Sequence, residues 1–152
     1  MPGIRYITGD ATNPQTPGNK IIAHICNDKG RWGAGFVLAL SKKWSAPEEY
    51  YRELLPEEIQ LCMTQLVPVE QDICVANMVA QHDTRFSEDG QPPIRYGALR
   101  VCLANVNDVA YRTKATLHMP RIGCGLAGGQ WSEIEKIIQD VCSVDVYVYD
   151  LP

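Results

Sequence analysis

The chain has 152 residues, of which 45% are hydrophobic and 21% are charged, and its formal net charge at pH 7 is −4. This length suits one domain with a core of its own. The acidic balance argues against a general nucleic-acid-binding protein, which needs a basic face to neutralise phosphates. It remains compatible with an enzyme that recognises one modified end of a nucleic acid. No apolar run approaches the length of about 20 residues that spans a bilayer.

The N-terminus and the cysteines both point to the cytosol. Residues 1–5 lack the basic and apolar regions of a secretory signal peptide. Cys26, Cys74 and Cys102 lie in apolar stretches, Cys124 lies in a glycine-rich stretch, and no zinc-site spacing occurs. We therefore expect buried reduced thiols, with a catalytic thiol at Cys124 as the alternative. With no metal-ligand constellation visible, we expect a site that uses neither metal nor cofactor.

Short β-rich runs alternate with helical patterns, which is typical of a mostly parallel sheet covered by helices. Pro68 indicates a sheet edge or a strand end. Residues 82–93, rich in charge, Gly and Pro, predict a loop. The expected strands are 4–8, 20–26, 61–69, 73–80, 116–119 and 145–149, and the expected helices are 36–44, a short helix from Pro47, one through 99–110 and one from about 131 to 141.

The start of the last helix carries a local signal. Ser132 and Glu135 have the spacing of a capping box, in which each side chain satisfies a free amide of the first turn. The apolar residues that follow recur at helical spacing. The sequence therefore predicts a capped helix with one buried face.

A glycine-rich stretch follows the second expected strand. Residues 23–36 read AHICNDKGRWGAGF, in which a strand ends near Cys26 and a helix opens at Gly35. Glycines let the backbone approach an anion closely, and a helix start offers unpaired amides and a positive dipole. This stretch predicts a phosphate cradle, with a tight turn that holds no ligand as the alternative.

Residues 120–131, PRIGCGLAGGQW, repeat the arrangement of strand, glycine-rich loop and helix. Glycines are costly in a purely structural loop, because each loses much backbone freedom on folding. In a parallel sheet both loops emerge at the carboxyl ends of strands, where ligands of open α/β sheets bind. Two such loops fit the two phosphates of a diphosphate.

A third element is Gly9-Asp10, directly after the first strand. A carboxylate at a strand end can accept a hydrogen bond from an exocyclic amine such as that of adenine. A turn or capping role is the alternative.

Taken together, these segments resemble the macrodomain family of ADP-ribose-binding modules. The matching segments are Gly9-Asp10, 24–36, 120–126, Gln130-Trp131 and 146–149. Within the family, the sequence is most similar to small terminal-ADP-ribose hydrolases and ADP-ribose-1''-phosphate phosphatases. The resemblance implies one three-layer α/β/α domain over residues 1–152, with a mixed, mostly parallel central sheet.

The resemblance also implies residue roles. Asp10 would hold the adenine amine, the two glycine-rich stretches would wrap the diphosphate, and Asn27 and Gln81 would face the distal ribose as the catalytic residues. Phe36 could instead be a core helix residue, Trp32 could serve a partner, and His24 is expected to be a core or supporting histidine. The implied ligand-binding residues are Gly9, Asp10, Ala11, Trp32, Gly33, Ala34, Gly35, Phe36, Pro120, Ile122, Gly123, Cys124, Gly125, Leu126 and Ala127.

The sequence departs from the family's pattern at two positions. Some hydrolases of this branch use a lysine nucleophile and an aspartate, where this chain has Gln81 and Ala127. Neither residue can perform that chemistry, so we expect no covalent lysine intermediate. A water held between Gln81, Asn27 and the ligand's own phosphate would replace it. Residues 28, 82, 83 and 85 could supply a base or a clamp, with solvated loop residues as the alternative.

The favoured hypothesis is a hydrolase that removes one ADP-ribose from a protein glutamate or a nucleobase, with water as nucleophile. A non-catalytic reader of ADP-ribose and an ADP-ribose-1''-phosphate phosphatase are the alternatives. The expected partners are ADP-ribose and ADP-ribosylated protein or nucleic acid. We expect a cytoplasmic monomer that does not associate with membranes.

Overall fold

The computed structural model describes residues 3–152 and is built on one six-stranded sheet, in the order β1-β6-β5-β2-β4-β3. Every neighbouring pair is parallel except β3 and β4. The predicted mixed, mostly parallel sheet is therefore confirmed. The strands are β1 (Ile4–Thr8), β2 (Lys20–Asn27), β3 (Thr64–Glu70), β4 (Ile73–Gln81), β5 (Thr116–Met119) and β6 (Val146–Asp150).

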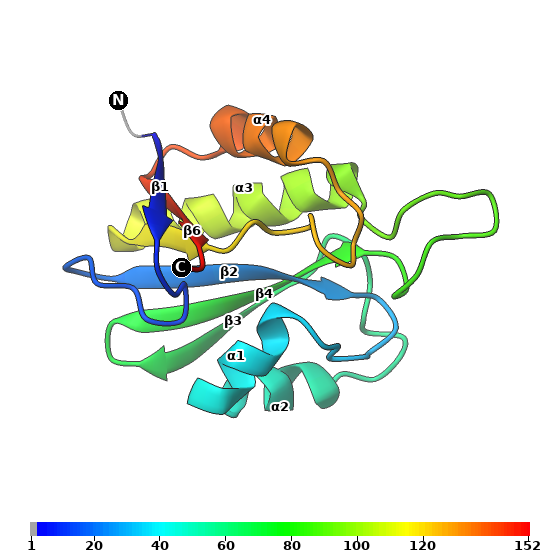
Figure 1. Ribbon diagram of the computed structural model, residues 1–152. Coiled ribbons are helices and arrows are strands. Elements are labelled where there is room, and N and C mark those ends of the chain that lie inside the picture. The colour runs from blue at the N-terminus through cyan, green and yellow to red at the C-terminus, as the bar shows by residue number, and fades with distance from the viewer. Residues whose placement is uncertain (1–2) are drawn as a thin grey trace.

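Helices cover both faces of the sheet, as Figure 1 shows. One face carries α1 (Phe36–Lys43) and α2 (Ala46–Arg52), and the other carries α3 (Tyr96–Thr113) and α4 (Trp131–Val141). These three layers confirm the predicted α/β/α architecture. No helix within residues 3–152 is long and apolar enough to cross a membrane.

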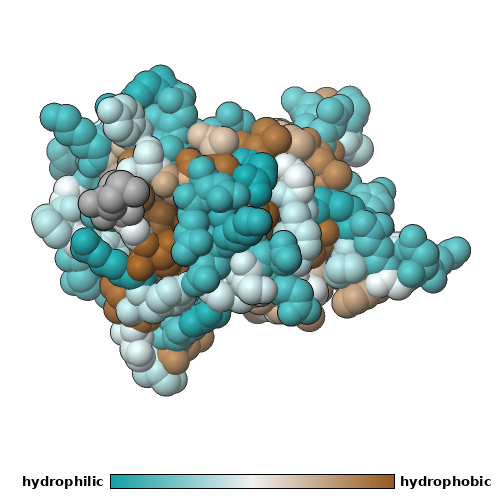
Figure 2. All heavy atoms as spheres, turned by 90° about the horizontal axis from the view of Figure 1, so that it is seen from above, coloured by the Kyte–Doolittle hydropathy of each residue, from teal (hydrophilic) through white to brown (hydrophobic). Residues whose placement is uncertain are grey.

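The apolar periodicity of α3 and α4 explains how that layer packs. The outer surface over α4 is mostly hydrophilic, with apolar side chains emerging between polar ones (Figure 2). Residues three or four positions apart share one helix face, and here that face is turned towards the sheet. The fully or nearly buried side chains are Leu99, Cys102, Leu103, Val106 and Ala110 in α3 and Ile134, Ile137 and Ile138 in α4.

Strand β3 begins later than the sequence predicted. The chain turns at residues 60–63, where Met63 N–H donates to Gln60 O (3.2 Å) and Cys62 has a φ of 81°. A left-handed residue interrupts extended backbone, so the strand starts at Thr64. Pro68 lies in this edge strand, as predicted, where its missing N–H costs no ladder bond. Residues 82–93 form the expected loop. A β-bridge between Gln81 and Ile94 joins the two residues that flank it.

The capping box was wrong. Helix α4 starts at Trp131, so Ser132 lies inside the first turn, and the N-cap residue Gln130 makes no side-chain capping bond. The Gln130 N–H donates instead to the hydroxyl of Tyr96 (2.9 Å), which comes from α3. Glu135 accepts a hydrogen bond from Tyr6 of β1. Tertiary partners thus took the roles that the local pattern had suggested.

We predict that Leu99→Ala lowers the free energy of unfolding by about 2 to 5 kcal/mol, because it leaves a cavity under α3. Leu99 is fully buried, whereas Val101 of the same helix is 44% exposed. Urea unfolding of both alanine variants measures the difference, and Val101→Ala should change stability by less than about 0.5 kcal/mol. Equal losses in the two variants would contradict the packing described for α3.

Candidate functional site

The site lies where two adjacent parallel strands end. Strands β2 and β5 pair from Lys20–Thr116 onward, so the chain leaves both at the same edge of the sheet. The first glycine-rich loop (residues 28–35) follows β2, and the second (residues 120–130) follows β5. A cavity of about 280 Å³ lies between these loops. The sequence had predicted this convergence.

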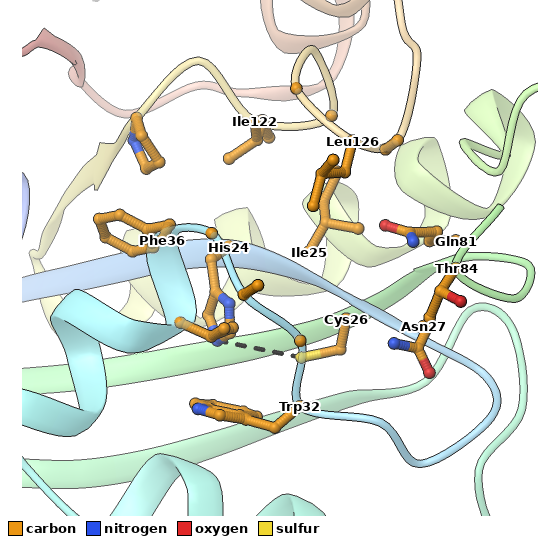
Figure 3. A pocket seen from close by; sticks show the side chains of 18 of the residues that line it. His24, Ile25, Cys26, Asn27, Trp32, Phe36, Gln81, Thr84, Ile122 and Leu126 are labelled. Carbon is orange, nitrogen blue, oxygen red and sulfur yellow. Dashed lines mark hydrogen bonds between the residues drawn. The ribbon is translucent and has the colours of Figure 1, made fainter.

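Figure 3 shows the side chains that line this cavity. Both predicted catalytic residues, Asn27 and Gln81, are part of the wall. The predicted ligand-binding residues in the wall are Trp32, Gly33, Ala34, Gly35, Phe36, Pro120, Ile122, Gly123, Gly125, Leu126 and Ala127, and those outside it are Gly9, Asp10, Ala11 and Cys124. Sequence reasoning did not assign six further wall residues, which are His24, Ile25, Cys26, Val37, Thr84 and Arg121.

Asn27 organises the first glycine-rich loop. Its Oδ1 accepts from the backbone N–H groups of Lys29 (2.9 Å) and Arg31 (3.2 Å), and its Nδ2 donates to Arg31 O (2.5 Å). The buried Tyr51 hydroxyl lies 3.0 Å from the same Oδ1 and donates to Asn27 O. With Oδ1 taken up in this way, the side chain holds the loop in shape and has only its second Nδ2 hydrogen to offer a ligand.

The glycines of the site fall into two groups. Gly123 and Gly128 have φ values of 75° and 73°, and a Cβ on Gly129 would lie 2.5 Å from Gly123 O, so the fold itself requires these three. Gly35 and Gly125 are different, because a Cβ on either would meet nothing within 4 Å. Both line the cavity. Their missing side chains leave the wall unobstructed at these two positions.

The start of α1 adds a favourable field for an anion. The N-cap residue is Gly35, which has no side chain to cap the helix, and the first turn contains no acidic residue. The first N–H groups of a helix have no intrahelical partner, and they carry the positive end of the helix dipole. Since Gly35 and Phe36 line the cavity, this helix end faces the space between the two loops.

Arg121 is the one permanently charged residue among the described residues of the cavity wall. Its Nε and Nη2 donate to the two carboxylate oxygens of Asp150, at 2.7 and 3.0 Å. The guanidinium also lies over the rings of Tyr6 and Trp131, at 5.0 and 5.2 Å. Hydrogen bonding from Arg121 lowers the pKa of Asp150, so this pair stays ionised at neutral pH. A bidentate pair of this kind fixes the guanidinium in one orientation.

The hydrogen bonds of His24 decide its tautomer. Its Nε2 lies 2.5 Å from Asn77 Oδ1, and Asn77 Nδ2 donates to the carbonyl of Pro47 (3.0 Å). Because a carbonyl can only accept, Oδ1 of Asn77 must be the acceptor for His24, and Nε2 of His24 carries the proton. Nδ1 is then an acceptor that is buried and has no partner within residues 3–152. Burial lowers the pKa of His24 to about 4.

One end of the cavity, which we call the distal end, is formed where β2 and β4 end. Asn27 and Gln81 are register partners there, and the Gln81 Nε2 donates to Asp83 O (2.8 Å). The Gln81 side-chain oxygen points into the cavity in Figure 3. Asp28 holds the segment that follows β4. Its Oδ1 accepts from Asp83 N–H (2.9 Å), and its Oδ2 lies 2.7 Å from His82 Nδ1.

Asp10 lies at the same edge of the sheet, after β1. Its Oδ1 accepts from the backbone N–H and the hydroxyl of Thr12, at 2.9 and 2.8 Å, which makes it a turn residue. Gly9 N–H donates to Asp150 O (2.8 Å) and so joins this turn to the end of β6. Asp10 is exposed. The structure thus shows the turn role, and the role in adenine binding stays a prediction.

The cysteines are all free in the described part of the chain. Cys26 and Cys102 are buried, as expected for structural thiols. Cys124 is partly buried, and this burial raises the pKa of its thiol. A raised pKa disfavours the thiolate, which is the nucleophilic form. The partial burial and raised pKa of Cys124 therefore give no support to a catalytic thiol.

Comparison with solved structures places this architecture among known proteins. A protein of unknown function from Bacteroides thetaiotaomicron is 51% identical, with a TM-score of 0.95, and the match covers 99% of both chains. A macrodomain protein from Streptomyces coelicolor is 44% identical with a TM-score of 0.84, over 97% of this chain and 98% of that one. The chain therefore belongs to the macrodomain family. No protein-family model matches the sequence.

Curated relatives carry more specific names. The mouse chromodomain-helicase-DNA-binding protein 1-like is 32% identical over 98% of this chain, which spans only 18% of that protein's length. An ADP-ribose 1''-phosphate phosphatase of Lodderomyces elongisporus is 24% identical, over 96% of this chain and 97% of the phosphatase. The ADP-ribose glycohydrolase OARD1 of Bos taurus is 27% identical, over 97% of this chain and 91% of the glycohydrolase.

The lowered pKa of His24 predicts a loss of stability in acid. Below a pH of about 6.5 the unfolded chain protonates this histidine, while the folded chain excludes the proton until its own pKa of about 4. Between pH 7 and pH 4.5, urea unfolding should therefore show that His24→Gln loses about 2 to 3 kcal/mol less stability than the wild type. Identical losses in the two proteins would show that His24 is not held neutral.

Proposed function

We propose that this chain binds ADP-ribose in the cavity and hydrolyses the bond that joins the distal ribose to a mono-ADP-ribosylated acceptor, with water as the nucleophile. The observation that carries the proposal is the pair of unobstructed glycines, Gly35 and Gly125, on facing loops of a macrodomain cavity. The acceptor would be a protein glutamate or a nucleobase.

The binding part of the proposal rests on main-chain donors. The N-terminus of α1 would hold one phosphate, and the amides of the second glycine-rich loop would hold the other. The wall needs no lysine for this task, since unpaired amides and the helix dipole already favour an anion. Asp10, at the carboxyl end of β1, would accept from the exocyclic amine of adenine through its second carboxylate oxygen. The ligand would then lie along the carboxyl edge of the sheet.

The catalytic part rests on the distal end. Gln81 offers an amide oxygen to the cavity and is held by Asp83, so it can orient a water but cannot attack the ribose itself. Ala127 provides no base. Asn27 would contribute by fixing the first glycine-rich loop, with one Nδ2 hydrogen for the distal ribose, rather than by activating the water. A covalent lysine intermediate has no residue to form it at these positions.

Two other activities remain alternatives. A non-catalytic reader of ADP-ribose is favoured by Gln81 and Ala127, which stand where some hydrolases carry lysine and aspartate. An ADP-ribose-1''-phosphate phosphatase is favoured by the similarity to the Lodderomyces phosphatase over nearly the whole length of both chains. All three activities use the same cavity, so the choice depends on what happens at the anomeric carbon.

Three assays on the purified chain separate these functions. The first measures ADP-ribose release from a mono-ADP-ribosylated protein and from mono-ADP-ribosylated DNA, and we expect release from one of them. The second measures phosphate release from ADP-ribose-1''-phosphate, and the third measures ADP-ribose binding by calorimetry. Micromolar binding without turnover in either assay would identify a reader, and absence of binding would reject the site.

We predict that Gly35→Glu and Gly125→Glu each abolish ADP-ribose binding, because the new carboxylate occupies the phosphate position with like charge. Neither glycine has a neighbour within 4 Å of an added Cβ, so both variants should fold. Gly97→Glu is the matched control, since Gly97 is equally unobstructed but lies in α3, outside the cavity wall. Calorimetry should detect binding only in this control, and wild-type affinity in either of the other variants would contradict the pocket.

A further inference from the structure

The cavity wall itself carries no group suited to accept a proton from the attacking water. His24 is buried and would carry a positive charge without a counter-ion if its Nδ1 took the proton, and Arg121 is a cation paired with Asp150. Gln81 has an amide in place of a base. A carboxylate that is to take the proton must therefore be reached through a wall residue, and the wall offers one hydroxyl side chain among its described residues, that of Thr84.

Thr84 connects the cavity to Asp83. Its hydroxyl donates to Asp83 Oδ1 (3.3 Å), and its backbone N–H donates to the same oxygen (2.7 Å). A hydroxyl that donates its hydrogen to a carboxylate keeps two lone pairs, so Oγ1 can accept a hydrogen bond from a molecule in the cavity. Thr84 belongs to the wall of the same cavity as Gln81 and Asn27 (Figure 3).

The segment around Thr84 is held firmly for a loop. Asp83 has a φ of 60°, a left-handed conformation that is uncommon for residues with a side chain. Asp28 receives the Asp83 N–H, and Gln81 Nε2 donates to the Asp83 carbonyl. Two hydrogen bonds, one to the residue after β2 and one from the end of β4, thus hold this uncommon backbone conformation. Strain that the surroundings maintain in this way is found at functional sites.

A backbone hydrogen bond and nearby positive charges keep the carboxylate of Asp83 ionised. The Thr84 N–H is the largest cause that lowers the pKa of Asp83, and Arg31, 4.0 Å away, and Arg85 lower it further. The other titratable groups at this place are Asp28, which faces the Asp83 backbone, and His82, which faces Asp28. Asp28 is not available to the cavity, since both of its oxygens already have partners.

We propose that Thr84 is a catalytic residue, which accepts a proton from the attacking water and passes its own to Asp83. This step rests on the proposed hydrolase function. One water hydrogen is held by Gln81 Oε1. The water oxygen forms a bond to the anomeric carbon, its other hydrogen moves to Thr84 Oγ1, and the Thr84 hydrogen moves to Asp83 Oδ1. The bond to the acceptor breaks, and its electron pair leaves with the acceptor.

The relay predicts how single variants behave on a peptide that is mono-ADP-ribosylated on glutamate. Thr84→Val keeps the side-chain shape and removes the hydroxyl, so kcat should fall by about 10² to 10⁴, the usual size of a general-base contribution. Thr84→Ser should stay within about threefold of the wild-type kcat, because it keeps the hydroxyl. Ser87→Ala is the control for a hydroxyl lost from the same loop outside the cavity wall. Calorimetry should give all variants the wild-type affinity for ADP-ribose.

Asp83→Asn tests the second half of the relay. Asparagine keeps Oδ1 as an acceptor and tolerates the left-handed conformation, so the loop should keep its shape. Its kcat should fall as far as that of Thr84→Val, and the double variant should fall no further, since the two residues act as one unit. The wild-type kcat should decline as acid protonates Asp83, and this decline should be absent from the residual activity of Asp83→Asn.

The outcomes separate this proposal from the proposed function. A wild-type chain that binds ADP-ribose but releases nothing from the peptide or from mono-ADP-ribosylated DNA would reject both. A wild-type chain that hydrolyses the peptide, together with an equally active Thr84→Val, would overturn the relay alone. Additive losses in the double variant would also overturn it, because they would show that Thr84 and Asp83 act separately.

Discussion

The structure depends on the parallel pairing of β2 with β5. Parallel strands end at the same edge of a sheet, so this one pairing brings together two loops that lie about ninety residues apart in the sequence. Both loops then line a common space of about 280 Å³. The helices that follow, α1 and α4, continue from these loops and anchor them to opposite faces of the sheet. The cavity is thus a consequence of topology before any side chain is considered.

Glycines serve this arrangement in two physically distinct ways. Those at positions 123, 128 and 129 allow the second loop to turn back on itself, where a side chain would be strained or would collide with backbone. Those at positions 35 and 125 have free space around them, so no steric contact requires a glycine there. Each glycine costs conformational entropy on folding. These two glycines lie on the two loops that line one cavity.

The polar groups around the cavity are held by partners outside it. Asn27 is fixed by the loop it organises, His24 by Asn77, Arg121 by Asp150, and Gln81 by the backbone of Asp83. Such support fixes side chains before a ligand arrives, which lowers the reorganisation needed for binding or catalysis. The wall is also nearly neutral, since its buried histidine carries no charge and its arginine is paired.

The sequence by itself determined the order of strands and helices, the two glycine-rich loops and the departures at Gln81 and Ala127. Those features are local, because periodicity, glycine content and neighbouring residues are written in consecutive positions. Only the tertiary structure decided that Asn27 folds its loop, that Tyr96 takes the place of a capping box, and that Thr84, His24 and Arg121 line the cavity. Each of these depends on a hydrogen-bond partner or a wall that comes from another segment of the chain. No local pattern specifies such a partner, since side chains meet across a sheet only after the strands have paired.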